Sequence, residues 1–159
     1  IMRPKKILEI GTYTGYSAIC LCEGLDNDGV LHTIDNNKKL IEIQNKYFKK
    51  ANLTNKIVQH SGDAKNILPS LDEEFDIVFI DADKESYPEY YDLIINKVSS
   101  GGIIIADNIL WSGKILEKVG KDDQATKSII EFNNKITQDD RVKNIILPIR
   151  DGLNIVRKN

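Results

Sequence analysis

The strongest constraint on the fold is a regular alternation of short apolar runs with longer amphipathic stretches. The apolar runs predict strands at residues 5–11, 30–35, 56–60, 75–81, 103–107, 142–148 and 153–157. The amphipathic stretches predict helices at residues 16–25, 38–51, 64–71, 88–98 and 123–137. Five strand–helix units followed by two strands joined at Asp151-Gly152 predict an α/β fold. We expect a doubly wound, mainly parallel seven-stranded sheet with one antiparallel edge strand.

Composition limits the class of protein. Hydrophobic residues make up 41% and charged residues 29%, which is typical of one globular domain over residues 1–159 and not of a disordered chain. A formal net charge of −2 gives no overall basic footprint for nucleic acid or an anionic membrane. No apolar run reaches the roughly 18 residues of a membrane span, and Cys20 and Cys22 are two residues apart on a predicted helix, so their side chains diverge and a disulfide between them is not expected. We therefore expect a cytoplasmic protein without a membrane partner.

Acidic residues follow the predicted parallel strands at their carboxyl ends. Ligands of doubly wound sheets bind beyond these ends. The segments there are Glu9-Ile10-Gly11, Asp35, Gly62-Asp63, Asp81-Ala82-Asp83 and Asp107-Asn108. We expect the functional site at this edge of the sheet.

The first glycine-containing loop, GTYTGYS at residues 11–17, narrows the choice of ligand. A dinucleotide fingerprint needs glycine where Tyr13 and Tyr16 stand, and the Gly-Lys-Ser/Thr of a phosphate-binding loop is absent. Asp35 suits a ribose diol, whereas Glu9 and Asp81 favour a positively charged group. S-adenosylmethionine, with a ribose, an ammonium, a sulfonium and no phosphate, fits this pattern.

Four blocks of sequence resemble the cation-dependent O-methyltransferases, the family of catechol O-methyltransferase and caffeoyl-coenzyme A O-methyltransferase. The blocks are ILEIGTYTGYSA (7–18), IDADKESYPEYY (80–91), ADNILWSGKI (106–115) and LPIRDGLNIVRK (147–158). The resemblance covers the chain in order and implies a Rossmann-like methyltransferase sheet, with further helices ahead of the first strand. Because the chain starts Ile1-Met2-Arg3-Pro4 and enters a predicted strand almost at once, we expect that an N-terminal segment is missing. Arg150 departs from the family, whose members often have glycine before this Asp-Gly pair.

The resemblance implies roles residue by residue. It implies that the methionine end and ribose of S-adenosylmethionine are held by Glu9, Gly11, Thr12, Ser17 and Asp35. It implies that Asp63 and Ala64 line the adenine and that Asp81 and Asp83 lie near the cofactor. A divalent cation would be bound by Asp81, Asp107 and Asn108. Lys84 would be the general base, Asp81 would serve catalysis through the cation, and Trp111 and Ser112 would meet the acceptor.

The residue types support this chemistry but also allow simpler interpretations. Two carboxylates and an amide oxygen suit Mg²⁺, and also Mn²⁺ or Ca²⁺. A cation with open positions would orient two neighbouring oxygens of an acceptor and lower the pKa of its hydroxyl, and Lys84 would take the proton. Taken alone, the acidic pairs are also typical of turns and caps, Lys84 of a solvated lysine, and Trp111 of a core anchor. His32 and His60 fall inside strands, where we expect structural roles.

The resulting hypothesis is an S-adenosylmethionine- and divalent-cation-dependent O-methyltransferase acting on a hydroxyl of a catechol-like small molecule. One alternative keeps the chemistry but methylates a hydroxylated uridine of transfer RNA, which a Lys/Arg patch beside the cation site would favour. An NAD-dependent oxidoreductase is opposed by Tyr13, and a non-catalytic binding module remains a further alternative. We also expect a homodimer, from the family resemblance and a sheet edge at residues 153–157.

Overall fold

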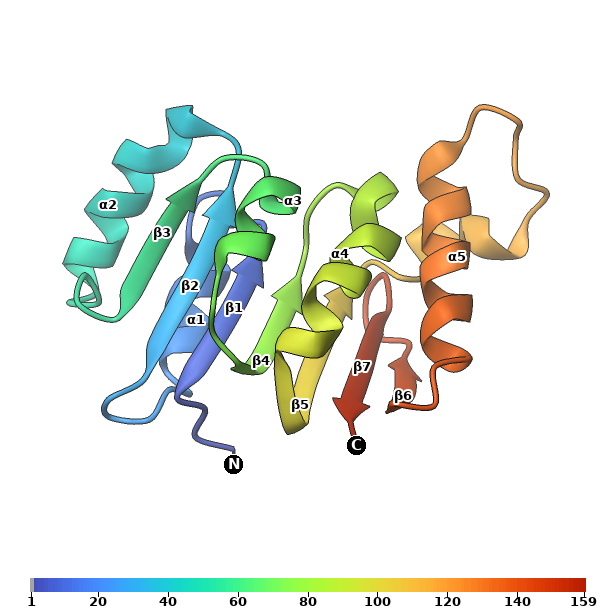
Figure 1. Cartoon of the computed structure of the whole chain (residues 1–159). Coiled ribbons are helices and arrows are strands. Elements are labelled where there is room, and N and C mark those ends of the chain that lie inside the picture. Colours follow the sequence, from blue (N-terminus) through green and yellow to red (C-terminus); the bar gives the residue numbers. More distant parts are fainter. Residues whose placement is uncertain (1) are drawn as a thin grey trace.

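A seven-stranded sheet in the order β3-β2-β1-β4-β5-β7-β6 runs through the structure, a computed structural model that describes residues 2–159 (Figure 1). The strands are β1 (Lys6–Ile10), β2 (Val30–Asp35), β3 (Ile57–Ser61), β4 (Phe75–Ile80), β5 (Val98–Asp107), β6 (Val142–Leu147) and β7 (Leu153–Lys158). The α-helices are α1 (Tyr16–Cys22), α2 (Ile41–Lys50), α3 (Ala64–Ile67), α4 (Tyr87–Ile94) and α5 (Gln124–Thr137). Short 3-10 helices are η1 (Lys38–Leu40), η2 (Leu68–Ser70), η3 (Lys84–Ser86), η4 (Ile95–Lys97) and η5 (Trp111–Leu116). Among residues 2–159, no helix has both the length and the apolar character that a bilayer crossing requires.

The predicted doubly wound, mainly parallel sheet is confirmed. Strands β1 to β5 pair in parallel, and β7 pairs antiparallel with both β5 and β6. The expectation that residues 153–157 form the free edge is wrong, because β6 lies outside β7. The long connection through α5 places β6 at the edge of the sheet and leaves a free position beside β5. The tight turn after β6 then brings β7 back into this position, between β5 and β6.

Strand β5 differs most from its prediction. It begins at Val98 and not at residue 103, and it passes through Gly101 and Gly102. Its pairing with β4 is irregular between Phe75 and Ile77. A side chain on Gly102 would stand 2.7 Å from Val98 Cγ1, and Gly101 has a φ of +79°. Gly101 and Gly102, which lie ahead of the predicted strand, therefore form an irregular stretch within the observed one.

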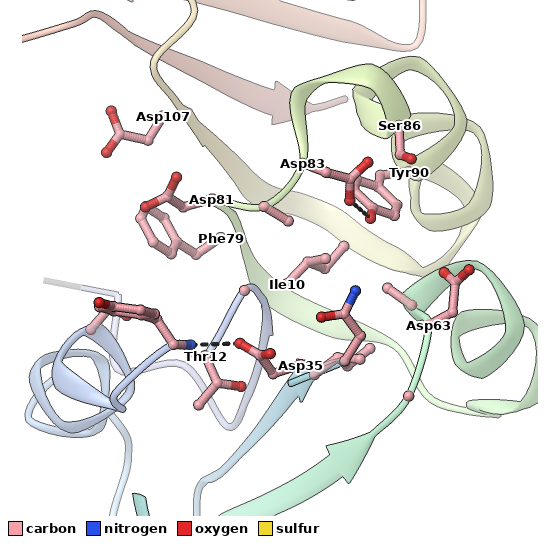
Figure 2. Close-up of a pocket in the computed structure, with 18 of the residues that line it drawn as sticks. Ile10, Thr12, Asp35, Asp63, Phe79, Asp81, Asp83, Ser86, Tyr90 and Asp107 are labelled. Atoms are coloured by element: carbon pink, nitrogen blue, oxygen red, sulfur yellow. Dashed lines mark hydrogen bonds between the residues drawn. The ribbon is translucent and has the colours of Figure 1, made fainter. Parts of the chain in front are cut away.

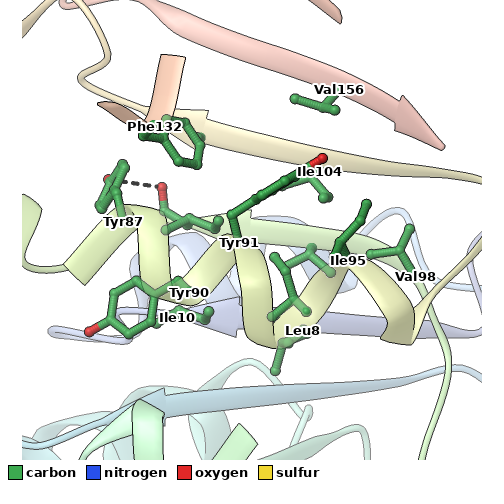
Figure 3. Close-up of a cluster of buried hydrophobic side chains, with 14 of the residues drawn as sticks. Leu8, Ile10, Tyr87, Tyr90, Tyr91, Ile95, Val98, Ile104, Phe132 and Val156 are labelled. Atoms are coloured by element: carbon green, nitrogen blue, oxygen red, sulfur yellow. Dashed lines mark hydrogen bonds between the residues drawn. The ribbon is translucent and has the colours of Figure 1, made fainter. Parts of the chain in front are cut away.

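Two hydrophobic clusters fill the two faces of the sheet. A smaller cluster joins β1–β3 to α1 and α2, with Phe48 of α2 at its centre. A larger cluster joins the opposite face to α3, α4 and α5, and Tyr87, Tyr91 and Phe132 meet within it (Figure 3). The Tyr87 and Tyr91 rings contact Phe132 edge-on at centroid distances of 5.3 and 6.2 Å. These two tyrosines pack the helix as expected, whereas Tyr90 of the same helix also reaches the pocket described below.

One half of the sheet carries an apolar row outside both clusters. Phe79, Ile105, Ile155 and Ile145 are neighbours in the strand register and point away from α5. Ile145, at the outermost strand, is 57% exposed. This row marks the β4–β5–β7–β6 half of the sheet as an apolar surface.

Candidate active site

The main pocket lies at the carboxyl ends of the parallel strands, where the sequence predicted a site. Its volume is about 830 Å³, which lies within the range of about 300–1,000 Å³ typical of small-ligand pockets. Of the predicted site residues, those that line it are Gly11, Thr12, Ser17, Asp35, Asp63, Ala64, Asp81, Asp83 and Asp107. Glu9, Lys84, Asn108, Trp111 and Ser112 are not among the lining residues. Figure 2 shows Asp81 and Asp107 near each other, with Asp35 and Asp63 farther along the pocket wall.

The loop after β1 is shaped by two glycines. Gly11 has a φ of +106°, and a Cβ there would lie 1.9 Å from the carbonyl oxygen of Asp81. Gly15 has a φ of +87°, and its Cβ would lie 2.6 Å from the Phe48 ring. Any other residue would push this loop away from the end of β4 or from α2. The glycines thus fix the first wall of the pocket against Asp81.

Asp35 organises the second wall. Its Oδ2 accepts a hydrogen bond from the Tyr13 backbone N–H at 2.7 Å (Figure 2). Its Oδ1 accepts one from the Asn37 N–H at 2.7 Å. Each carboxylate oxygen keeps capacity for another donor. The Asp35 side chain therefore lines the pocket in a fixed orientation.

Glu9 lies beneath the glycine loop rather than in the pocket wall. It is fully buried, its Oε2 accepts a 2.5 Å hydrogen bond from Thr33 Oγ1, and its Oε1 has no hydrogen-bond partner. Burial raises the pKa of this carboxyl from 4.5 to about 7, against the lowering effect of the nearby Ser17 and Thr33 hydroxyls. Although Ser17 lies near enough to lower the pKa, no hydrogen bond from it reaches Oε1. The unpaired oxygen is compatible with a cationic ligand group above it.

Two further carboxylates stand on the far side of the pocket. Asp63 caps α3 by accepting from the Lys65 N–H at 2.9 Å, and Asp83 Oδ1 accepts from the Tyr90 hydroxyl at 2.5 Å. Tyr90 was not predicted as a site residue, because three tyrosines at positions 87, 90 and 91 suggest only helix packing. Phe79, Tyr13 and Tyr16 were likewise missed, although they line the pocket. The sequence did carry a signal for Tyr13 and Tyr16, because both are aromatic residues in the loop that follows the first strand.

Asp81 and Asp107 follow strand partners directly, since Ile80 of β4 pairs with Ala106 of β5. Their side chains therefore reach the same end of the pocket. Asn108 has a φ of +60°, and its N–H donates to Asp107 Oδ1 at 2.6 Å. Across residues 2–159 no group of three or more His, Cys, Asp or Glu side chains is arranged to hold a metal. The candidate cation set is thus two carboxylates supplemented by an amide, with oxygen donors only.

Lys84 is a buried lysine and not a solvated one. Its side chain is 8% exposed, whereas that of Asp81 is 44% exposed. The Lys84 Nζ donates to Asp81 Oδ1 at 3.0 Å and to the Tyr87 hydroxyl at 2.6 Å. Burial, with the negative charge of Asp81 and Asp107, holds the pKa of Tyr87 well above its usual range, so the phenol stays protonated.

Trp111 and Ser112 lie in the loop beyond Asn108, outside the pocket wall. Both have positive φ values, 48° and 54°, and the Trp111 Nε1 is buried without a hydrogen-bond partner. The Ser112 N–H donates to Asp151 Oδ1 at 2.5 Å, which ties this loop to the turn between β6 and β7. Arg150 in that turn is exposed and does not line the pocket.

Comparison with known proteins agrees with this geometry. The sequence model of the O-methyltransferase family matches residues 1–159. Caffeoyl-CoA O-methyltransferase of Populus kitakamiensis is 34% identical over 99% of this chain and 72% of its own length. Caffeoyl-CoA O-methyltransferase 1 of Zea mays is 35% identical over 97% of this chain and 64% of its own length. The chain spans only 56% of tricin synthase 2 from rice.

Solved structures agree as well. The Bacillus cereus O-methyltransferase in complex with SAH has a TM-score of 0.93 at 29% identity, covering 99% of this chain and 76% of that chain. TomG of Streptomyces achromogenes in complex with SAM has a TM-score of 0.91 at 29% identity, covering 99% and 74%. These matches include the whole sheet and every loop that forms the pocket. The chain belongs to the O-methyltransferase family.

Proposed function

We propose that this chain transfers a methyl group from S-adenosylmethionine to a hydroxyl oxygen. The observation that carries the proposal is that one pocket contains Asp35 together with the carboxylates of Asp81 and Asp107. The pocket has the glycine turn of a nucleoside site but no phosphate cradle. The related structures with SAH and SAM support the same ligand here.

Within this proposal, the cofactor extends along the pocket from the glycine loop to Asp63. Gly11, Thr12 and Ser17 hold its methionine end, and Asp35 holds the ribose. The unpaired Oε1 of Glu9 supports a cationic group of the cofactor nearby, although Glu9 lies beneath the glycine loop and not in the pocket wall. At the far side, Asp63, Ala64 and Asp83 border the adenine. Asp81, which lies at the same end of the pocket as Asp107, is proposed to lie nearest the methionine end and its sulfonium.

The proposed reaction also uses a divalent cation held by Asp81, Asp107 and Asn108. Carboxylate and amide oxygens fit Mg²⁺, and also Mn²⁺ or Ca²⁺. Such a cation, when bound, would act as a Lewis acid toward the acceptor oxygens. The exposure of Asp81, whose side chain is 44% accessible, leaves room for an acceptor beside it.

Lys84 is the proposed general base, and its ammonium, which is paired with Asp81 in the ligand-free protein, must release a proton to water before Nζ can take one from the acceptor. The acceptor oxygen forms a bond to the methyl carbon while the carbon–sulfur bond breaks, and the hydroxyl proton passes to Lys84 Nζ. The two hydrogen-bond partners of Nζ hold it 3.0 Å from the Asp81 carboxylate, next to the proposed acceptor position. Trp111 and Ser112, on the neighbouring loop, are proposed to meet the rest of the acceptor.

The proposed acceptor is a catechol-like small molecule. Two relatives are named for caffeoyl-CoA, whose caffeoyl group carries two neighbouring phenolic oxygens. Among the pocket-lining residues that the structure describes, Lys65 is the single basic side chain. The lining of the pocket therefore gives no support to a transfer RNA acceptor.

A methyl-transfer assay tests the proposal. Labelled S-adenosylmethionine is incubated with a panel of catechols, matched monophenols and a transfer RNA, with Mg²⁺ or with excess EDTA. We expect label on the catechols only, and only without EDTA. Transfer that survives EDTA contradicts the cation, and transfer to RNA alone contradicts the acceptor class.

We further propose a homodimer. The support is the exposed apolar side chains of β6 and the turn that follows it, where Ile145, Ile146 and Ile149 are 57%, 41% and 56% exposed. Apolar side chains on an outermost strand are costly to leave in water and are common at subunit contacts.

A further inference from the structure

The hydroxyl of Tyr87 stands at the junction of the two strand ends that carry the acidic residues. It lies 3.0 Å from the carbonyl oxygen of Asp107 and 3.2 Å from that of Ile80. A phenol has one hydrogen, so it donates to one carbonyl at a time, and the shorter distance favours Asp107. Its lone pairs accept the hydrogen bond from Lys84 Nζ at 2.6 Å. One oxygen atom thus contacts β4, β5 and Lys84.

The Tyr87 side chain has no freedom to change this arrangement. It is fully buried, and its ring packs edge-on against Phe132 of α5 at 5.3 Å. The Lys84 ammonium also lies 4.6 Å from the centre of the Tyr87 ring, within the range of cation–π attraction. A lysine side chain ordinarily samples many rotamers, and fixing it in one of them costs conformational entropy. Tyr87 thus restricts Lys84 through two contacts, the hydrogen bond from Nζ to the Tyr87 hydroxyl and the cation–π contact with the Tyr87 ring.

We propose that Tyr87 is a positioning residue that holds Lys84 Nζ in place relative to Asp81 and Asp107. The inference rests on the proposed role of Lys84 in methyl transfer. Tyr87 touches neither the pocket nor the acceptor. It acts through Lys84, because loss of its hydroxyl leaves Nζ with Asp81 as its sole protein partner among the hydrogen bonds described.

Tyr91 provides a matched control on the same helix. Like Tyr87 it is fully buried and contacts Phe132, and its hydroxyl donates to Asp139 Oδ2 at 2.8 Å. Tyr91 does not contact Lys84 or either strand end. Tyr91→Phe therefore removes one hydroxyl and its hydrogen bond from the same helix without removing a contact to Lys84.

The test compares Tyr87→Phe, Tyr91→Phe, Lys84→Ala and the double variant Lys84→Ala/Tyr87→Phe. Turnover and KM for a catechol are measured with saturating cofactor, and SAH affinity is measured by calorimetry. We expect Tyr87→Phe to lower kcat by about 10- to 100-fold, because misplacement of a catalytic group by about 1 Å has that effect. SAH affinity and the kcat of Tyr91→Phe should stay within about twofold. In the Lys84→Ala background, Tyr87→Phe should cause no further loss.

A second readout does not depend on activity. An ammonium that is buried and doubly hydrogen-bonded exchanges its protons slowly, so the ¹⁵N-bound protons of Lys84 should be visible by NMR in the wild type and in Tyr91→Phe. The signal is assigned by its loss in Lys84→Arg, and it should vanish in Tyr87→Phe. Absence of this signal in the wild type overturns the inference, even where a variant fails to fold.

Two kinetic outcomes also overturn it: equal effects of Tyr87→Phe and Tyr91→Phe, or a full additional loss in the Lys84→Ala background. If the wild type transfers no methyl group to any acceptor, the proposed function fails. The NMR comparison still decides whether Tyr87 fixes Lys84.

Discussion

The buried carboxyl of Glu9 should make the ligand-free protein less stable as the pH rises. Glu9 is fully exposed to water in the unfolded chain but 0% exposed in the fold. Burial raises its pKa from 4.5 to about 7, and the negative charges of Asp81 and Asp35 add to this. The folded state therefore keeps a proton on Glu9 at pH values where the unfolded state has lost it.

The magnitude follows from the two pKa values. Below pH 4.5 both states are protonated, and Glu9 imposes no pH dependence. From there to about pH 7 the unfolding free energy falls by about 1.4 kcal/mol for each pH unit. The total loss is about 3 kcal/mol, and it is complete above the folded-state pKa.

Glu9→Gln should remove this loss. Urea unfolding is measured at pH 5 and pH 8 for the wild type, for Glu9→Gln and for the exposed control Glu42→Gln, all without cofactor. Burial lowers the pKa of His32 and His60, which gives an opposite trend, but it is common to all three proteins and cancels in the comparison. The unfolding free energy of Glu9→Gln relative to the wild type should rise by about 2–3 kcal/mol between the two pH values. If the unfolding free energy of Glu9→Gln relative to the wild type stays constant within about 0.5 kcal/mol between the two pH values, as it should for Glu42→Gln, the raised pKa of Glu9 is contradicted.

Three further predictions concern the ligand, the base and the assembly. Asp35→Ala should weaken SAH binding more than tenfold in calorimetry, on the order of 1.5–3 kcal/mol for a lost charged hydrogen bond; unchanged affinity contradicts the ribose assignment. Lys84→Ala should lower kcat by about 10²–10⁴ with little change in SAH affinity, and a smaller loss in steady-state kinetics contradicts its role as base. Light scattering after size-exclusion chromatography should give twice the 18.0 kDa chain mass, and Ile145→Lys should shift the protein to a monomer. A wild-type monomer at high concentration contradicts the dimer.

The placement of the site was predictable from the sequence because strand ends obey topology. Asp81 and Asp107 end strands that are consecutive along the chain, and consecutive parallel strands usually pair. The register of Ile80 with Ala106 confirms that they are neighbours. The tight turn of the first loop was also predictable, because its glycines lie between a strand and a helix. The structure agrees, since it leaves no room for a Cβ at Gly11.

Burial at the site was not predictable. The alternation of β1 places Glu9 on one face of the strand, but only the packing of α1 decides whether water reaches it. The sequence around Lys84 is typical of a surface lysine. Its burial depends on Tyr87, and the Tyr87 ring packs against Phe132 of α5, which lies more than forty residues away along the chain. The order of β7 and β6 likewise depends on where the connection through α5 ends. These features come from tertiary packing, which local periodicity does not encode.

We expect Asp107 to serve the acceptor side of the proposed cation-dependent methyl transfer and not to hold the cofactor. The most direct measurement is the methyl-transfer rate of Asp107→Ala with Mg²⁺, saturating catechol and a concentration of S-adenosylmethionine shown by calorimetry to saturate the variant. We expect Asp107→Ala to transfer no methyl group, while its affinity for the cofactor stays within a few-fold of that of the wild type. Wild-type turnover by the saturated variant would contradict it, and would leave Asp107 and Asn108 as residues of a turn.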